Sequence, residues 1–213
     1  MCTFGKWIKK AKNLVNSANI SLEEMYFERA ALYAEFGKIF VVGMGFLFVN
    51  KQGELSLKVK TIANADEKEL LVEFIDIINK TYKARELTLV AHNGKEFDFP
   101  YLCRRMLIHG IGLPEPLQIA GKKPWEVRHL DTMELWKFGD YKHYTSLKLL
   151  TSILGIPSPK DDISGSEVGA VFYKEKNIQR IVIYCEKDTI AIAQLLLRFN
   201  NEPLIEDLNI VHV

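Results

Sequence analysis

The stretch that most restricts how this chain folds is an apolar, glycine-containing run from Ile39 to Val49, followed directly by the polar segment 50–53. That segment reads Asn-Lys-Gln-Gly, and Asn and Gly favour tight turns because their backbones tolerate left-handed conformations. Beyond it, Leu55, Leu57 and Val59 alternate with polar residues, as in a strand with one covered face. These two segments therefore predict an antiparallel β-hairpin.

After the hairpin, signals for helices and strands alternate. Asp66 suits the N-cap of an amphipathic helix, Leu87–Ala91 reads as a short strand, and Asp98 followed by Pro100 signals another helix. The residues expected on the inner face of that helix are Leu102, Met106 and Leu107. The later elements expected are a strand at 128–133, a helix at 147–154 and a long helix at 178–199. This order predicts an α/β fold, with a mixed sheet and flanking helices.

Composition narrows the class of protein. The chain has 213 residues, 48% of them hydrophobic, which is ample for one buried core. A net charge of +1 gives no basic field for long duplex DNA, although an enzyme that holds only a strand end does not need one. Three cysteines without CxxC spacing indicate neither a disulfide framework nor a zinc site.

The chain shows no apolar stretch of membrane-spanning length and no signal peptide, so we expect a cytoplasmic protein. Residues 1–25 read as a peripheral N-terminal segment, and residues 26–213 read as a single domain.

The C-terminal helix carries an acid inside an apolar stripe. Asp188 recurs at helical spacing with Ile181, Cys185 and Leu195, and Tyr184 lies one turn before it. A carboxylate on a buried face usually meets a cation, a metal or several donors, because burying it alone is costly. The alternative is a solvated Asp at the edge of the stripe beside an ordinary core tyrosine.

A second group of candidate residues lies where the strand at 87–91 ends and the next helix begins. Here Asn93 is followed by Phe97 and Asp98, and ligands of open α/β sheets bind at strand ends. The alternative is structural: Asn93 makes a turn, Asp98 caps the helix and Phe97 fills the core.

Taken together and in this order, the two motifs resemble those of a known family. Asn93-x-x-x-Phe97-Asp98 is similar to the second motif, and Tyr184-x-x-x-Asp188 to the third motif, of DEDDy-type 3'-5' exonucleases. The chain resembles the bacterial predicted exonucleases related to the proofreading domain of family B DNA polymerases, which have a ribonuclease H-like fold. The other stretches that carry the resemblance are 27–31, 35–39, 131–140, 145–147 and 154–162.

The resemblance implies hydrolysis of terminal phosphodiesters at a single-stranded 3' end, with DNA favoured over RNA. It implies two Mg²⁺ or Mn²⁺ ions about 4 Å apart, held by carboxylates. Asp98 and Asp188 would be metal ligands, and Tyr184 would orient the attacking water. Asn93 and Phe97 would shape the pocket for the terminal nucleotide.

The chain departs from the family at the first motif, an Asp-x-Glu on the first, central strand. No Asp-x-Glu occurs in the sequence, and the early acids Glu23, Glu24, Glu28 and Glu35 do not follow an apolar strand. We therefore expect a sheet without its usual first strand and weak or absent hydrolysis. A reading frame that begins upstream of Met1 would account for both; the alternative is an inactive module that binds single-stranded ends.

Three further features stay open at this level. The segments 122–125 and 137–142 mix basic and aromatic residues, which suits either contact with a single strand's phosphates or solvated loops. The five histidines show no metal-type pairing. Asp131 has no assigned role.

Overall fold

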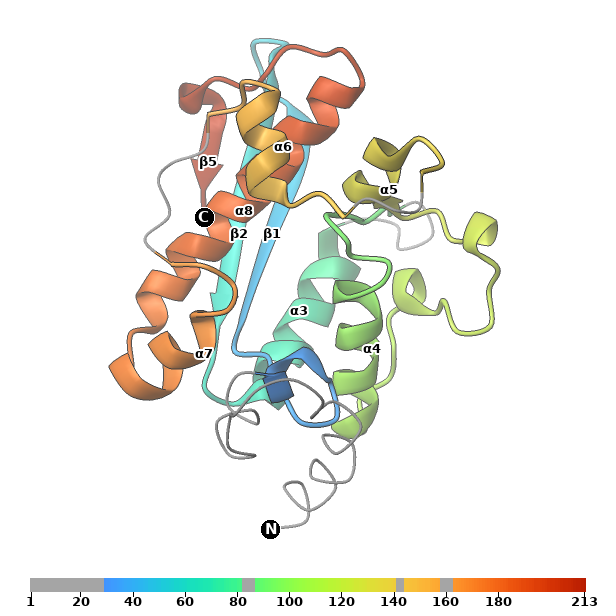
Figure 1. Cartoon of the computed structure of the whole chain (residues 1–213), viewed down its shortest axis with the longest axis vertical. Coiled ribbons are helices and arrows are strands. Elements are labelled where there is room, and N and C mark those ends of the chain that lie inside the picture. Colours follow the sequence, from blue (N-terminus) through green and yellow to red (C-terminus); the bar gives the residue numbers. More distant parts are fainter. Residues whose placement is uncertain (1–28, 82–86, 141–143, 158–162) are drawn as a thin grey trace.

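The computed structural model describes residues 29–81, 87–140, 144–157 and 163–213 (Figure 1). Its strands are β1 (Val41–Val49), β2 (Leu55–Ala63), β3 (Val90–Ala91), β4 (Leu130–Asp131) and β5 (Ile210–His212). Its α-helices are α3 (Glu67–Thr81), α4 (Asp98–Ile108), α5 (Thr132–Lys137), α6 (Leu147–Ile153), α7 (Val168–Ala170) and α8 (Ile178–Phe199). Short 3₁₀ turns lie at Ala30–Leu32, Glu115–Leu117, Pro124–Glu126 and Asp207–Asn209, and a π-helical turn at Val171–Glu175.

The predicted hairpin is confirmed. β1 and β2 pair antiparallel from Val41 opposite Ala63 to Val49 opposite Leu55, and Gly53 takes the left-handed conformation of the turn at φ 84°. β5 joins the other edge of β2 in parallel, a strand that the sequence did not predict. β3 and β4 form a parallel pair, so the strands in the described ranges make two sheets rather than one. The expected class of fold, α/β with a small mixed sheet and flanking helices, is confirmed.

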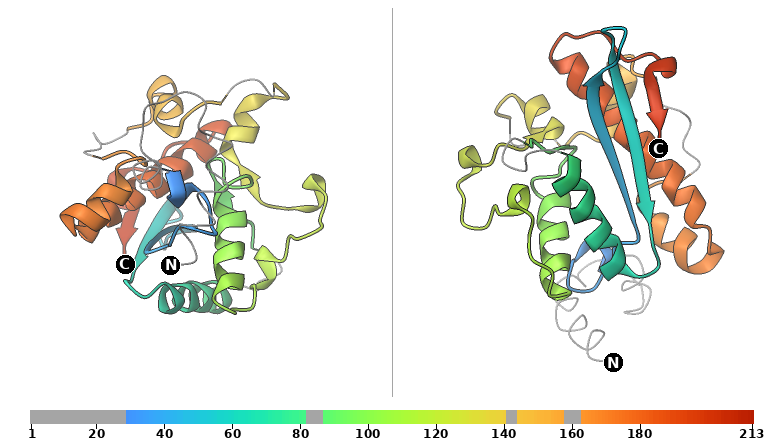
Figure 2. Two further views of the ribbon diagram at one scale, coloured as in Figure 1. Left: turned by 60° about the horizontal axis from the view of Figure 1, so that its bottom comes forward. Right: turned by 180° about the vertical axis from the view of Figure 1, so that it is seen from behind.

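The hairpin lies between α3 and α8, as Figures 1 and 2 show from different sides. On one face, Val42 and Met44 pack against a core that the α3 residues Leu70 and Phe74 help to form. On the other face, Gly43 meets α8. A Cβ added at Gly43 would come within 2.6 Å of the Thr189 hydroxyl oxygen and 2.9 Å of the Cys185 carbonyl oxygen, so the close approach of β1 to α8 requires a glycine here.

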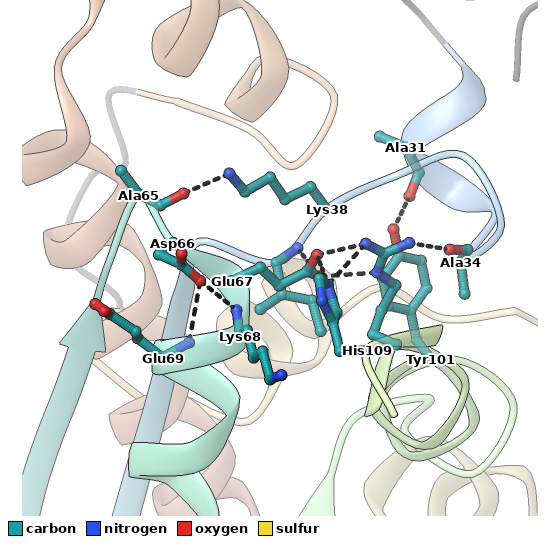
Figure 3. A network of polar contacts seen from close by, with 12 residues as sticks. Ala31, Ala34, Lys38, Ala65, Asp66, Glu67, Lys68, Glu69, Tyr101 and His109 are labelled. Atoms are coloured by element: carbon teal, nitrogen blue, oxygen red, sulfur yellow. Dashed lines mark hydrogen bonds and ion pairs between the residues drawn. The ribbon is translucent and has the colours of Figure 1, made fainter. Parts of the chain in front are cut away.

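A buried charged network ties the segment before β1 to α3 and α4 (Figure 3). Glu67, in the first turn of α3, accepts hydrogen bonds from the Ile39 amide at 2.7 Å and from Arg105 Nε at 2.8 Å, and His109 Nε2 lies 2.7 Å from its Oε2. Arg105 Nη1 donates to the Ala34 carbonyl at 2.8 Å. Burial alone would raise the pKa of Glu67, but the hydrogen bonds from Arg105, Ile39 and His109 lower it below its usual range.

Several predicted boundaries were wrong. The strand predicted at 87–91 is formed only at Val90–Ala91, and the one predicted at 128–133 gives way to α5 after Asp131. Leu107, predicted to face inward, is 63% exposed, because Arg105 and Met106 occupy the buried side of α4. The prediction that residues 1–25 are peripheral lies outside the described residues. Among the helices of the described ranges, none is both long and apolar enough to cross a bilayer.

Candidate functional site

The turn after β3 is organised by a single buried carboxylate, that of Asp131. Asn93 takes a left-handed backbone conformation at φ 63°, which turns its amide toward this carboxylate. The Asn93 amide donates to Asp131 Oδ1 at 2.9 Å, and the Lys95 amide donates to Oδ2 at 3.0 Å. Asp131 therefore fixes the path of the backbone that leads into α4.

The same carboxylate also caps α5. Its Oδ1 accepts from the amide of Met133 at 2.9 Å and, at a longer 3.4 Å, from that of Glu134. Asp131 is only 2% exposed, so nearly all of its hydrogen bonding comes from the protein. The sequence did contain a signal for this role, because Asp131 and Glu134 have the spacing of a capping box.

Asp98 is the first residue of α4 and its side chain reaches solvent. The structural alternative for this residue is not supported: the N-cap is Phe97, and no side-chain hydrogen bond caps the helix there. Surrounding protein atoms desolvate the exposed carboxyl enough to raise its pKa to about 6, and the negative charge of Asp131 acts in the same direction. A carboxyl whose pKa is raised by desolvation and by a neighbouring negative charge is a candidate for binding a cation.

Tyr184 and Asp188 lie one turn apart on α8, and both are half-buried. Between them, burial and then the negative charges of Asp188, Asp98 and Glu186 together raise the pKa of the Cys185 thiol to about 12. Both carboxylates thus raise the pKa of the same thiol, although they lie on helices far apart in the sequence.

Tyr184 and Phe97, also singled out from the sequence, make different contacts. The Tyr184 ring packs against the buried group Phe40, Ile163, Val171 and Ile181, and a Cβ added at Gly165 would lie 3.8 Å from its hydroxyl. Phe97 is 38% exposed, and its ring contacts that of Tyr101, with centroids 5.4 Å apart. Phe97 is therefore neither a fully buried core residue nor a fully free ring.

The chemistry of the donor set fits a hard divalent cation. Two carboxylates supply the oxygen ligands that Mg²⁺ and Mn²⁺ prefer, and Mg²⁺ often completes its shell with water and substrate phosphate. In the part of the chain that the structure describes, no group of three or more His, Cys, Asp or Glu side chains converges as a metal site would require. Asp98 and Asp188 therefore stand as two candidate ligands rather than as a complete metal site.

A comparison with protein families gives an independent finding. Residues 34–203 match the model of a family described as a predicted 3'-5' exonuclease related to the exonuclease domain of PolB. The matched range contains both motifs as well as Asp131.

Proposed function

This chain belongs to the family of predicted 3'-5' exonucleases related to the exonuclease domain of PolB, and from that membership we propose that it acts on the 3' ends of single-stranded nucleic acid. DNA is the favoured substrate over RNA, and the reaction is hydrolysis of the terminal phosphodiester with the help of Mg²⁺ or Mn²⁺. The observation that carries the proposal is the family match over residues 34–203, a range that contains Asp98, Tyr184 and Asp188.

Each candidate residue has a role in this proposal. Asp98 and Asp188 would hold the cation, which when bound supplies charge for the leaving 3' oxygen and activates water. The hydroxyl of Tyr184, one turn from Asp188, orients the attacking water. Asn93 and Phe97 shape the pocket for the terminal nucleotide, and Asp131 holds the Asn93 backbone in place.

The proposed activity is impaired in this chain as it stands. The sequence contains no Asp-x-Glu, so the first-motif carboxylates of the family are missing and the opposing charge for two divalent ions falls by half. This observation favours a second candidate function, a module that binds single-stranded ends without cleaving them.

Mn²⁺ binding tests the metal site. Asp98→Asn and Asp188→Asn should each weaken Mn²⁺ binding by about tenfold or more, measured by titration calorimetry, because each removes one of the two ligand charges. Asp76→Asn is the matched control, since Asp76 is exposed on α3 and pairs only with Lys80 among the ion pairs of the described residues. If neither site variant differs from Asp76→Asn, the metal role of both aspartates is wrong.

Incubation with an oligonucleotide separates the two candidate functions. A 5'-labelled single strand and Mg²⁺ should yield slow, stepwise shortening from the 3' end if the chain is an impaired exonuclease. Retention of the strand with no product after long incubation would instead assign the binding function. Asp188→Asn should abolish any product. Product that persists with this variant would come from a contaminating nuclease.

A further inference from the structure

Tyr144 presents an aromatic ring to solvent beside the candidate site. Its side chain is 68% exposed, yet the Asn93 side-chain amide donates a hydrogen bond to its hydroxyl. The next residue is fastened as well, because His92 Nε2 lies 2.9 Å from the Thr145 carbonyl oxygen and must be the donor to it. Two consecutive residues at the end of β3 thus hold two consecutive residues of the segment before α6.

Asn93 fixes the position of the Tyr144 hydroxyl relative to Asp98, because the Asn93 carbonyl accepts from the Phe97 amide at 3.0 Å, one residue before Asp98. Partial burial raises the pKa of Tyr144, and the charges of Glu96, Asp131 and Asp98 raise it further. The hydroxyl is therefore held by the turn that leads into Asp98, which the proposed function assigns to the cation. The oxygen accepts from Asn93, so its own hydrogen can be donated elsewhere.

An exposed ring held in this way is suited to stacking. Folding gains little from an aromatic ring left in water, whereas nucleic-acid proteins use such rings as platforms for bases of any sequence. Held by hydrogen bonds to the turn that leads into Asp98, the ring can meet the base whose phosphodiester lies at the carboxylates.

We propose that Tyr144 stacks on the base of the 3'-terminal nucleotide, a role that rests on the proposed function and adds a residue to its substrate site. Stacking reads the face of a base rather than its edge, so Tyr144 confers a requirement for a base without a preference among the four. The ring carries this role, and the hydroxyl serves to hold the ring in place.

Two oligonucleotide probes that differ only at the 3'-terminal residue test the proposal. One carries a base there and the other is abasic, and both have a phosphorothioate at the last linkage to slow hydrolysis. Binding is measured by fluorescence anisotropy with Mg²⁺ present. Wild-type protein should prefer the base-bearing probe by about 5- to 100-fold, the range that base–aromatic stacking gives.

The variants separate the ring from the hydroxyl. Tyr144→Ala should bind both probes equally, and Tyr144→Phe should keep most of the preference. Tyr173→Ala is the matched control, because Tyr173 is also an exposed tyrosine, at 61%, and lies on the π-helical turn after α7. Unchanged melting temperature and Mn²⁺ affinity in Tyr144→Ala would show that the fold and metal residues are intact.

The outcomes are distinguishable. If wild-type protein prefers the base-bearing probe and Tyr144→Ala keeps that preference, the stacking role is wrong while the proposed function stands. The stacking role is also wrong if wild-type protein binds both probes equally. If wild-type protein binds neither probe, the proposed function fails and the role of Tyr144 fails with it.

Discussion

Replacing Asp131 should destabilise the protein and loosen the candidate site in one step. Asp131→Ala removes the acceptor for the amides of Asn93, Lys95 and Met133, at 2.9, 3.0 and 2.9 Å, and the weaker contact to Glu134 at 3.4 Å. Losing the cap of α5 costs about 1 kcal/mol. Each of the two amides in the turn after β3 adds about 1 kcal/mol, the low end for an unsatisfied buried donor, since water can reach this half-buried turn.

The expected loss is therefore about 3 kcal/mol. For a chain of this length each kcal/mol lowers the melting temperature by about 2–4 °C, so Asp131→Ala should melt about 6–12 °C below wild type in calorimetry. Asp131→Asn keeps one acceptor oxygen but turns an NH₂ group toward one donor. This variant should therefore lose about 1–2 kcal/mol of stability. Glu134→Gln is the control: its ion pair with Lys95 is half-exposed, and its removal costs about 1 kcal/mol at most.

The functional consequence is measured in the same variants. Because the turn held by Asp131 leads directly to Asp98, Asp131→Ala should also weaken Mn²⁺ binding below the melting transition. A melting temperature within about 2 °C of wild type would refute the capping argument. A large drop in melting temperature with wild-type Mn²⁺ affinity would refute the link from Asp131 to the site.

Three further predictions follow from the charges. Mn²⁺ affinity should decline as pH falls below about 6, the raised pKa of Asp98, because protons compete for the carboxylate; Asp98→Asn should show a flat profile over that range. Glu67→Ala should cost about 3–5 kcal/mol in urea unfolding at neutral pH by leaving Arg105 buried without its partner. The pKa of Glu67 in the folded protein is lowered below 4.5, so the stability that Glu67 contributes is present above pH 4.5 and is lost on acidification. The stabilities of the variant and of wild type should therefore converge at low pH. A difference that stays constant with pH would contradict the lowered pKa. The pKa of the Cys185 thiol is raised from 9.0 to about 12, so in the native protein this thiol should react with iodoacetamide roughly a thousandfold more slowly than an ordinary thiol. Denaturation should restore the ordinary rate. Fast labelling of Cys185 in the native protein would contradict its burial.

Local pattern was sufficient for several elements. The long helix predicted at 178–199 is α8 (Ile178–Phe199), and the helix predicted from residue 147 is α6, which Ser146 caps by accepting from the Leu149 amide at 3.3 Å. Asp66 caps α3 as predicted, by accepting from the amides of Lys68 and Glu69. These predictions succeed because helix periodicity and caps involve residues only a few positions apart.

For the candidate site, the sequence identified the residues but not how they are arranged. The sequence singled out Asp98 and Asp188 as residues of interest, but nothing local shows that both charges act on Cys185, because that depends on how α4 and α8 are packed. Tyr144 had no motif of its own, and its relation to Asn93 joins positions 51 residues apart.

The hairpin run that restricts the fold was readable from the sequence alone, because strand alternation and turn chemistry are properties of neighbouring residues. Only the tertiary structure decided that Arg105 would occupy the buried side of α4 while Leu107 faces solvent, since Glu67 supplies the buried opposite charge from another helix. It also decided that β5 would join β2 and that Asp131 would hold the turn at Asn93. Pairings of this kind depend on which distant segments meet, and no local periodicity encodes them.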